Sequence, residues 1–179
     1  MKLEQTADGS YTLYVPELDE HYHSVKGALT ESQHIFIEMG LKHSPVSEPH
    51  ILEIGLGTGL NAFLTLLSAE ETRRKVHYTG IERYPLAEET LKQLDYPRLI
   101  GKQHEEDYYA IHRAPWNTET EALGSHYIKL KMILPGFSTR RKAAVPPFPY
   151  TISSTLMPSL PKNNPKCGNN LFSILYTRY

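Results

Sequence analysis

Ile51-Leu52-Glu53-Ile54-Gly55-Leu56-Gly57-Thr58-Gly59-Leu60-Asn61 is the stretch that decides the fold of this chain. Its apolar start predicts a short buried strand, its three glycines predict a turn, and the apolar run that begins at Leu60 predicts a helix. In an open α/β sheet, nucleotide-like ligands bind at such a strand-to-helix turn. The stretch therefore predicts an α/β fold with its ligand site at the turn.

The details of the turn separate two cofactors. A dinucleotide fold uses G-x-G-x-x-G/A, and counted from Gly55 the last small position is occupied by Leu60. Glu53, two residues before the first glycine, supplies a carboxylate that can receive an ammonium group. S-adenosylmethionine carries a sulfonium and an α-amino group and has no phosphate. The pattern favours S-adenosylmethionine, and an NAD-dependent oxidoreductase is the weaker alternative.

A second acid follows at the end of the next predicted strand, which spans Val76 to Glu82. An acid at the position of Glu82 typically accepts hydrogen bonds from ribose hydroxyls. The alternative without a cofactor site is a glycine-rich turn beside two solvated glutamates. The spacing of the two acids and Asn61 around the turn favours a site for a methyl donor. The residues predicted to bind this cofactor are Glu53, Gly55, Gly57, Gly59, Asn61 and Glu82.

The segments around the turn predict a hairpin and two helices. Thr6–Ser10 has the composition of a turn, and Tyr11–Val15 alternates β-forming residues that can pair with the residues around Leu3. Glu31–Met39 predicts a helix with Ile35, Phe36 and Met39 on its inner face and Gly40 as its stop. Leu86–Leu94 predicts a second helix, with Leu91 and Leu94 as its apolar side chains. Strand, helix, strand, helix is the opening of a doubly wound sheet.

Composition limits the class of protein. A chain of 179 residues with 40% hydrophobic residues is sized for one globular domain. No apolar run reaches the roughly 18 residues of a membrane span, and the first residues lack the core of a signal peptide. Cys167 is the only cysteine, so a cytoplasmic location is expected. His21 and His23 alternate on one extended face, but no spacing here predicts a metal site.

Three runs resemble a known family: T-A-D-G-S-Y-T-L-Y-V-P-E-L-D-E-H-Y-H-S-V-K-G-A-L-T-E-S-Q-H-I-F-I (Thr6 to Ile37), I-L-E-I-G-L-G-T-G-L-N and Y-T-G-I-E-R-Y-P-L. They are similar to the tRNA 5-methylaminomethyl-2-thiouridine methyltransferases, and the resemblance covers about Thr6 to Trp116. It implies a Rossmann-like class I methyltransferase fold with an N-terminal hairpin and helix extension. It also implies S-adenosylmethionine as cofactor and the wobble uridine of tRNA as substrate. In bacteria these enzymes occur alone or fused to an FAD-dependent oxidase, which is the implied pathway partner.

Residues are carried over one by one. Glu53, the three glycines and Asn61 match the family's cofactor turn, and Glu82 matches its ribose acid. A further family signature is expected near the cofactor or the substrate, and it is matched by Tyr22, His23, Ser24 and Glu31. The alternative reading of those four is a packed, hydrogen-bonded N-terminal subdomain.

The resemblance ends where the composition changes. All twenty acidic residues lie at or before Glu121, so the chain up to that residue sums to −9 with eleven basic residues, and the rest sums to +8. The tail is rich in proline and shows no strand–helix alternation. The predicted division is an N-terminal extension at 1–45, half of a methyltransferase domain at 46–128, and an acid-free tail at 129–179. The sheet is expected to be incomplete after about residue 128.

A shift of reading frame accounts for the tail better than an RNA-binding role does. Read one nucleotide upstream, the codons of 150–170 can encode Y-D-I-I-Y-F-D-A-F-A-P-E-K-Q-P-E-M-W-E-Q, which resembles the family's D-A-F-A-P and P-x-M-W motifs. Leu156 and Met157 stand at the corresponding positions here, so no catalytic residue is assigned. We expect a frameshift between about Lys129 and Tyr150 and an inactive, marginally stable chain. The alternative is a non-enzymatic S-adenosylmethionine- or RNA-binding module that uses the basic tail.

Overall fold

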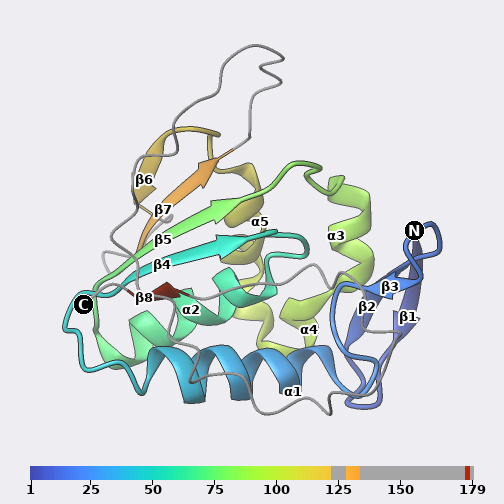
Figure 1. Cartoon of the computed structure of the whole chain (residues 1–179), viewed down its shortest axis with the longest axis horizontal. Helices are drawn as coiled ribbons and strands as arrows, with labels where there is room; N and C mark the ends of the chain where they lie inside the picture. Colours follow the sequence, from blue (N-terminus) through green and yellow to red (C-terminus); the bar gives the residue numbers. More distant parts are fainter. Residues whose placement is uncertain (122–127, 134–175, 178–179) are drawn as a thin grey trace.

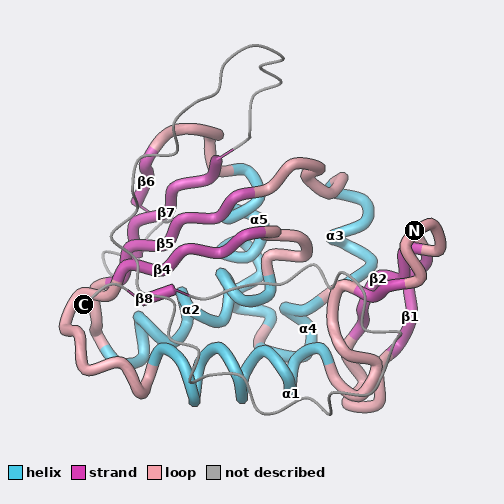
Figure 2. The backbone as a smooth tube through the Cα atoms, viewed as in Figure 1, coloured by secondary structure: helices cyan, strands magenta, loops and turns pink. Residues whose placement is uncertain are grey.

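The computed structural model describes residues 1–121, 128–133 and 176–177, and it contains two β-sheets (Figure 1). The smaller sheet has the order β1-β2-β3 and the larger one β6-β7-β5-β4-β8. Figure 2 shows the helices lying along the larger sheet and the smaller sheet at one end of it. The predicted α/β class is confirmed.

The centre of the larger sheet is parallel. β4 (His50–Ile54) pairs with β5 (Val76–Ile81) from His50↔His77 to Ile54↔Ile81, and β5 pairs with β7 (Ile128–Ile133) from Val76↔Ile128 to Ile81↔Ile133. Each of these three parallel strands therefore lies beside the next parallel strand along the chain, while β6 (Glu119–Glu121), which precedes β7 in the sequence, lies outside them at the edge. The carboxyl ends of all three meet at one edge, and there the glycine turn follows β4. The strands predicted around the turn are confirmed.

The first crossover helix, α2 (Leu60–Thr72), is the centre of the core. It contacts α1, η1, α5 and β5. Its side chains Leu60, Ala62, Phe63, Leu66 and Ala69 are all at most 1% exposed, so the helix is enclosed on several faces. An amphipathic surface helix would show one apolar stripe instead.

The predicted N-terminal hairpin is confirmed. β1 (Lys2–Gln5) pairs antiparallel with β2 (Tyr11–Val15), and β2 pairs with the short β3 (Glu20–His21). The turn is organised by Asp8, whose Oδ1 accepts hydrogen bonds from Thr6 Oγ1, from Ser10 N and, at 2.5 Å, from Ser10 Oγ. Its Oδ2 accepts from Thr30 N at 2.8 Å, in the first turn of α1 (Ala28–Ser32). Asp8 therefore caps a helix from a distant turn.

Replacing Asp8 by alanine is expected to free the start of α1. Burial acts to raise the pKa of Asp8, but the hydrogen bonds from Ser10, Thr30 and Thr6 outweigh it and hold the pKa well below its usual range. A lost cap costs about 1–2 kcal/mol, so amide exchange at Thr30 should accelerate about tenfold or more in Asp8→Ala. The control is Glu17→Ala, at an exposed side chain in the loop after β2. Unchanged exchange at Thr30 would show that the carboxylate is not the cap.

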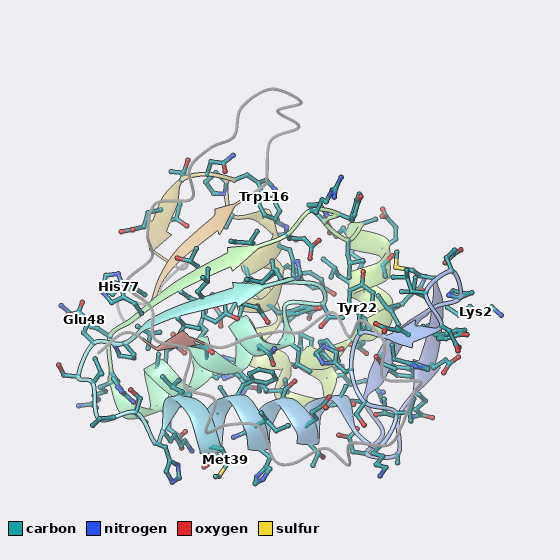
Figure 3. All side chains as sticks on the ribbon, viewed as in Figure 1. Lys2, Tyr22, Met39, Glu48, His77 and Trp116 are labelled. Carbon is teal, nitrogen blue, oxygen red and sulfur yellow. The ribbon has the colours of Figure 1, made fainter. Side chains whose placement is uncertain are left out.

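The next helix departs from the prediction. Residues Gln33–Leu41 form a π-helix, η1, which continues α1 past the expected stop at Gly40. Ile35 and Met39 are 44% and 42% exposed, and Met39 points away from the core in Figure 3. The buried positions are Ile37 and Leu41. The predicted inner face is wrong for Ile35 and Met39, whereas Phe36 is half-buried, because the wider turns of a π-helix change which residues align on one side.

The second crossover consists of short elements. They are α3 (Glu88–Leu94), α4 (Tyr96–Ile100), the 3-10 helix η2 (Lys102–His104) and α5 (Glu105–Arg113). Leu91 and Leu94 are buried as predicted, although α3 begins two residues later than expected. In the described part of the chain, no helix has the length and apolar character to cross a membrane.

The sheet continues past residue 128, where the sequence predicts that it becomes incomplete. β7 reaches Ile133, and its apolar residues alternate with Lys129 and Lys131, which is the pattern of a strand. The prediction missed this strand because it took the absence of acidic residues after Glu121 as the end of the fold. β6 (Glu119–Glu121) flanks β7 antiparallel. At the opposite edge of the sheet, β8 (Tyr176–Thr177) pairs antiparallel with Ile51 and Leu52 of β4. The region of the proposed frameshift beyond Ile133, with Leu156 and Met157, lies outside the described residues.

Candidate functional site

The glycine turn joins the carboxyl end of β4 to α2. Gly55, Gly57 and Gly59 have φ values of +86°, +52° and +70°, a region that L side chains rarely adopt. The turn is tied to the neighbouring strand, because Gly55 N donates to Ile81 O at 2.7 Å. It is closed internally by Gly59 N donating to Leu56 O at 2.8 Å. The three glycines are therefore required by the backbone itself.

Glu53 lies at the base of the turn and is only 1% exposed. Its Oε1 accepts from Asn61 Nδ2 at 2.8 Å, and its Oε2 accepts from the Tyr78 hydroxyl at 2.5 Å. Burial and the Glu53 carboxylate raise the pKa of Tyr78 well above its ordinary value, so this phenol stays protonated and donates. The carboxylate is thus held in place by two donors from two different elements.

Asn61 adds an acceptor beside this carboxylate. With Nδ2 donating to Glu53, the amide presents Oδ1 on its other side, and this buried oxygen has no hydrogen-bond partner within the described residues. A buried acceptor without a partner costs about 1–3 kcal/mol, which a bound donor can recover. A carboxylate together with an amide oxygen suits a ligand that carries N–H donors and positive charge.

Glu82 lies on the other side of the turn, at the end of β5. Its Oε2 accepts from Gly57 N at 2.9 Å, and its Oε1 accepts from the backbone N–H groups of Arg83 and Tyr84, both at 2.7 Å. The acid predicted to meet a ribose is therefore adjacent to the glycine turn. It is only partly buried, so its carboxylate stays accessible beside these bonds.

Two residues of the N-terminal signature reach the turn and two do not contact it directly. A Cβ placed on Gly57 would lie 2.9 Å from Tyr22 Cδ1, so the tyrosine ring packs directly on the glycine (Figure 3 labels Tyr22). His23 Nε2 lies 2.7 Å from Thr58 Oγ1. Ser24 and Glu31 contact each other, since Ser24 N donates to Glu31 Oε2 at 2.9 Å. This pair holds the segment after His23 against α1.

The sequence reasoning missed two residues of α5 that contact the same turn. The Tyr108 hydroxyl donates to the carbonyl oxygen of Thr58 at 2.9 Å, and His112 Nε2 donates to it at 3.1 Å. The two side chains are four residues apart and lie on one face of α5. Such a pair has the sequence pattern of an ordinary core stripe, and only the tertiary contact reveals its partner.

The two histidines of the site are neutral at pH 7. Burial lowers the pKa of His23 to about 4. Burial also lowers that of His112 to about 4, although its hydrogen bond to Thr58 acts in the opposite direction. His21 lies elsewhere, paired with Glu4 at 2.8 Å, so the two histidines of the extended segment do not converge. Within the described residues, no group of three metal-ligating side chains comes together.

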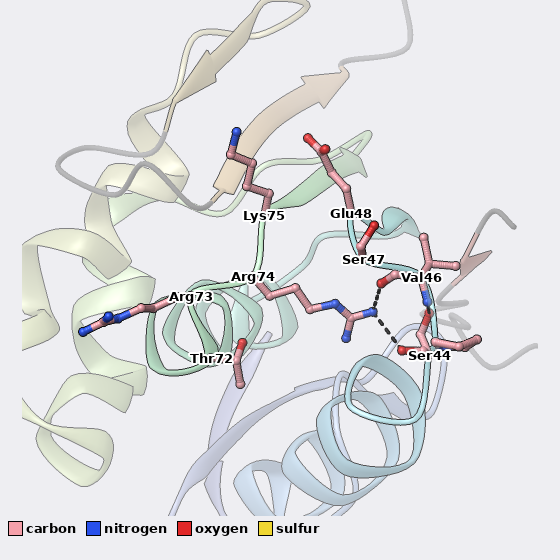
Figure 4. Close-up of a pocket in the computed structure, with 9 residues that line it drawn as sticks. Ser44, Val46, Ser47, Glu48, Thr72, Arg73, Arg74 and Lys75 are labelled. Atoms are coloured by element: carbon pink, nitrogen blue, oxygen red, sulfur yellow. Dashed lines mark hydrogen bonds between the residues drawn. The ribbon is translucent and has the colours of Figure 1, made fainter.

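A separate pocket of about 500 Å³ lies at the other end of α2 (Figure 4). Arg74 crosses it and donates to the carbonyl oxygens of Leu41, Ser44 and Val46. Leu41 is the last residue of η1 and the other two follow it, so the guanidinium lies at the carboxyl end of this helix, where a cation is favoured. A 13-residue helix separates this pocket from the glycine turn by about 20 Å. The basic run Arg73-Arg74-Lys75 therefore belongs to a helix end and not to the glycine turn.

Comparison with known proteins agrees with the resemblance. The chain is 34% identical over 94 residues to the tRNA 5-methylaminomethyl-2-thiouridine biosynthesis bifunctional protein MnmC of Magnetococcus marinus. This match covers 48% of the chain and 14% of that protein. The MnmC protein of Cupriavidus metallidurans is 34% identical over 89 residues, which are 46% of the chain and 13% of the relative. The predicted similarity to this family is confirmed.

The structural comparison extends the match. The crystal structure of MNMC2 from Aquifex aeolicus superposes with a TM-score of 0.58 and 27% identity, over 76% of this chain and 42% of that one. No family model matches the chain. The chain spans about one seventh of the length of the curated relatives described above.

Proposed function

We propose that this chain carries the cofactor half of a Rossmann-like, S-adenosylmethionine-dependent methyltransferase that acts in modification of the tRNA wobble uridine. The observation that carries the proposal is the acceptor pair at the carboxyl end of β4. There the buried Glu53 carboxylate adjoins the unpartnered Asn61 Oδ1. The parallel order β7-β5-β4 supports the proposal, because open α/β sheets bind ligands at the carboxyl ends of such strands. The similarity to MnmC supports the tRNA pathway.

The residues of the turn fit this cofactor. Glu53 and Asn61 would receive the α-ammonium group, and Glu82 would receive the ribose hydroxyls. Gly55 offers a cradle, because a Cβ built on it meets no atom within 4 Å, so a ligand can approach its backbone closely. When bound, S-adenosylmethionine supplies the electrophilic methyl group. Leu60 is fully buried where a dinucleotide site needs a small residue, which disfavours NAD.

The methyl acceptor requires a second half of the site. Methyl transfer to an amine is an in-line displacement that needs an aligned, uncharged nitrogen, so the protein acts mainly by positioning. In the related enzymes the D-A-F-A-P loop is implied to lie beside that nitrogen. We propose that tRNA is the substrate and that an FAD-dependent oxidase acts in the same pathway. The expected chain divisions remain proposals, with the end of the middle one moved from residue 128 to Ile133 because β7 ends there.

The proposed cofactor is tested by calorimetric titration of S-adenosylhomocysteine and NAD into the full chain. We expect binding of S-adenosylhomocysteine and none of NAD. Glu53→Gln should weaken that binding at least about tenfold, because a buried hydrogen bond to a charged group contributes roughly 1.5–3 kcal/mol. The matched control is Glu17→Gln, an exposed acid of the N-terminal extension. NAD binding, or equal affinities of Glu53→Gln and the unaltered chain, would contradict the assignment.

A further inference from the structure

Thr58 is the buried, non-glycine residue in the middle of the glycine turn. It is 1% exposed and lies between Gly57 and Gly59, both at positive φ. Glycines on both sides give this segment more accessible backbone conformations than any other flanking pair would. One conformation is therefore selected by contacts from outside the turn.

Side chains from distant parts of the described chain supply contacts of this kind to Thr58. His23, just before α1, bonds the Thr58 hydroxyl at 2.7 Å. Tyr108 and His112, on successive turns of α5, donate to the Thr58 carbonyl oxygen at 2.9 and 3.1 Å. A carbonyl oxygen has two lone pairs, so these two donors fill its capacity. They fix the plane of the peptide bond between Thr58 and Gly59.

The rings of His112 and Tyr22 pack against Gly59 and Gly57, which have no side chains. A Cβ on Gly59 would lie 2.5 Å from His112 Nε2, and one on Gly57 would lie 2.9 Å from Tyr22 Cδ1. The imidazole therefore occupies space that any other residue at 59 would fill. Glycine at this position allows the close approach of α5 as well as the positive φ.

We propose that His112 is a positioning residue which, with Tyr108 and His23, holds the Thr58–Gly59 peptide in the orientation that binds the cofactor. The proposal rests on the proposed function for the identity of the ligand, and it adds α5 to a site predicted from β4, β5 and the N-terminal signature alone. It also gives the N-terminal extension a role in cofactor binding, through the bond between His23 and Thr58. Neutral imidazoles suit this task, because an uncharged His112 donates from Nε2 without placing a charge in the core.

The test compares two replacements of His112 in the full chain. His112→Phe keeps a ring without a donor, and His112→Gln keeps an N–H donor of similar reach. We expect S-adenosylhomocysteine to bind about five- to thirtyfold more weakly to His112→Phe, and within about threefold of the unaltered affinity to His112→Gln, because a buried acceptor without its donor is costly. The matched control is His34→Phe, at an exposed histidine of η1.

A second readout does not need the cofactor. Amide hydrogen exchange at Gly59, whose N–H donates to Leu56 O, should accelerate about fivefold or more in ligand-free His112→Phe and stay unchanged in His34→Phe. If His112→Phe fails to fold, Tyr108→Phe removes a single hydroxyl and should weaken binding about three- to tenfold. Equal affinities and equal Gly59 exchange in Tyr108→Phe, His112→Phe and the unaltered chain would overturn the proposal. Faster exchange in a chain that binds no S-adenosylhomocysteine would instead overturn the proposed cofactor.

Discussion

Gly57→Ala is expected to weaken binding of S-adenosylhomocysteine by about a hundredfold. Two costs add at this residue. An alanine at φ +52° carries the penalty of the left-handed region, of order 1–2 kcal/mol. Its Cβ would also lie 2.9 Å from the Tyr22 ring, so the ring or the turn must move. The Gly57 N–H that donates to Glu82 would move with the turn, so Glu53 and Glu82 would no longer be held in the same positions relative to the turn. Calorimetric titration measures the loss.

Two other glycines separate strain from the loss of ligand space. Gly9→Ala, in the hairpin turn, has φ +83° and meets no atom within 4 Å, so it carries strain alone and should leave the affinity unchanged. Gly55→Ala has nearly the same φ and the same open space, but it lies in the proposed cradle. It should weaken binding although the ligand-free turn has room for it. Similar affinities for all three variants would argue against a ligand over this turn.

Repair of the reading frame is expected to have the largest effect of all. Because β7 pairs with β5 along its whole length, we place the shift after Ile133 and before about Tyr150. Within the described residues, β4 meets β8 only at Ile51 and Leu52, and Ile54, the last residue of β4, is 47% exposed. The repaired chain should supply the strands that a class I sheet needs on this side. It should methylate undermodified tRNA, and the chain as printed should not.

Repair of the reading frame should also raise the stability of the chain. We expect a broad thermal transition and aggregation for the printed chain, because an unselected tail does not bury the apolar face of a central strand. The repaired chain should unfold cooperatively, with a Tm that rises when S-adenosylmethionine is added. Sequencing the coding DNA provides the direct check. An unbroken frame that encodes this same tail in close relatives would refute the frameshift, and a sharply cooperative transition of the printed chain would contradict its marginal stability.

The elements that could be predicted are those whose signal is local. The hairpin follows from the turn composition of Thr6–Ser10 beside the alternating run Tyr11–Val15, and the central strands follow from short apolar runs bounded by turn residues. The sequence predicts a helix over Glu31–Met39, which overlaps α1 and η1, but not its buried face, because side-chain periodicity assumes an α-helix and η1 is a π-helix. The strand at Ile128–Ile133 is not predicted, because the acidic residues end at Glu121 while the alternating strand pattern continues to this strand.

By itself, the sequence determined the turn and its two acids. Spacing along one chain is enough to set glycines at positive φ after a strand and to put Glu53 and Glu82 at the ends of neighbouring parallel strands. Only the tertiary structure decided what holds that turn. His23, Tyr108 and His112 are separated from Thr58 by 35 to 54 residues, and all three converge on it. Contacts at that separation depend on how the elements pack, which leaves no periodic trace in the sequence.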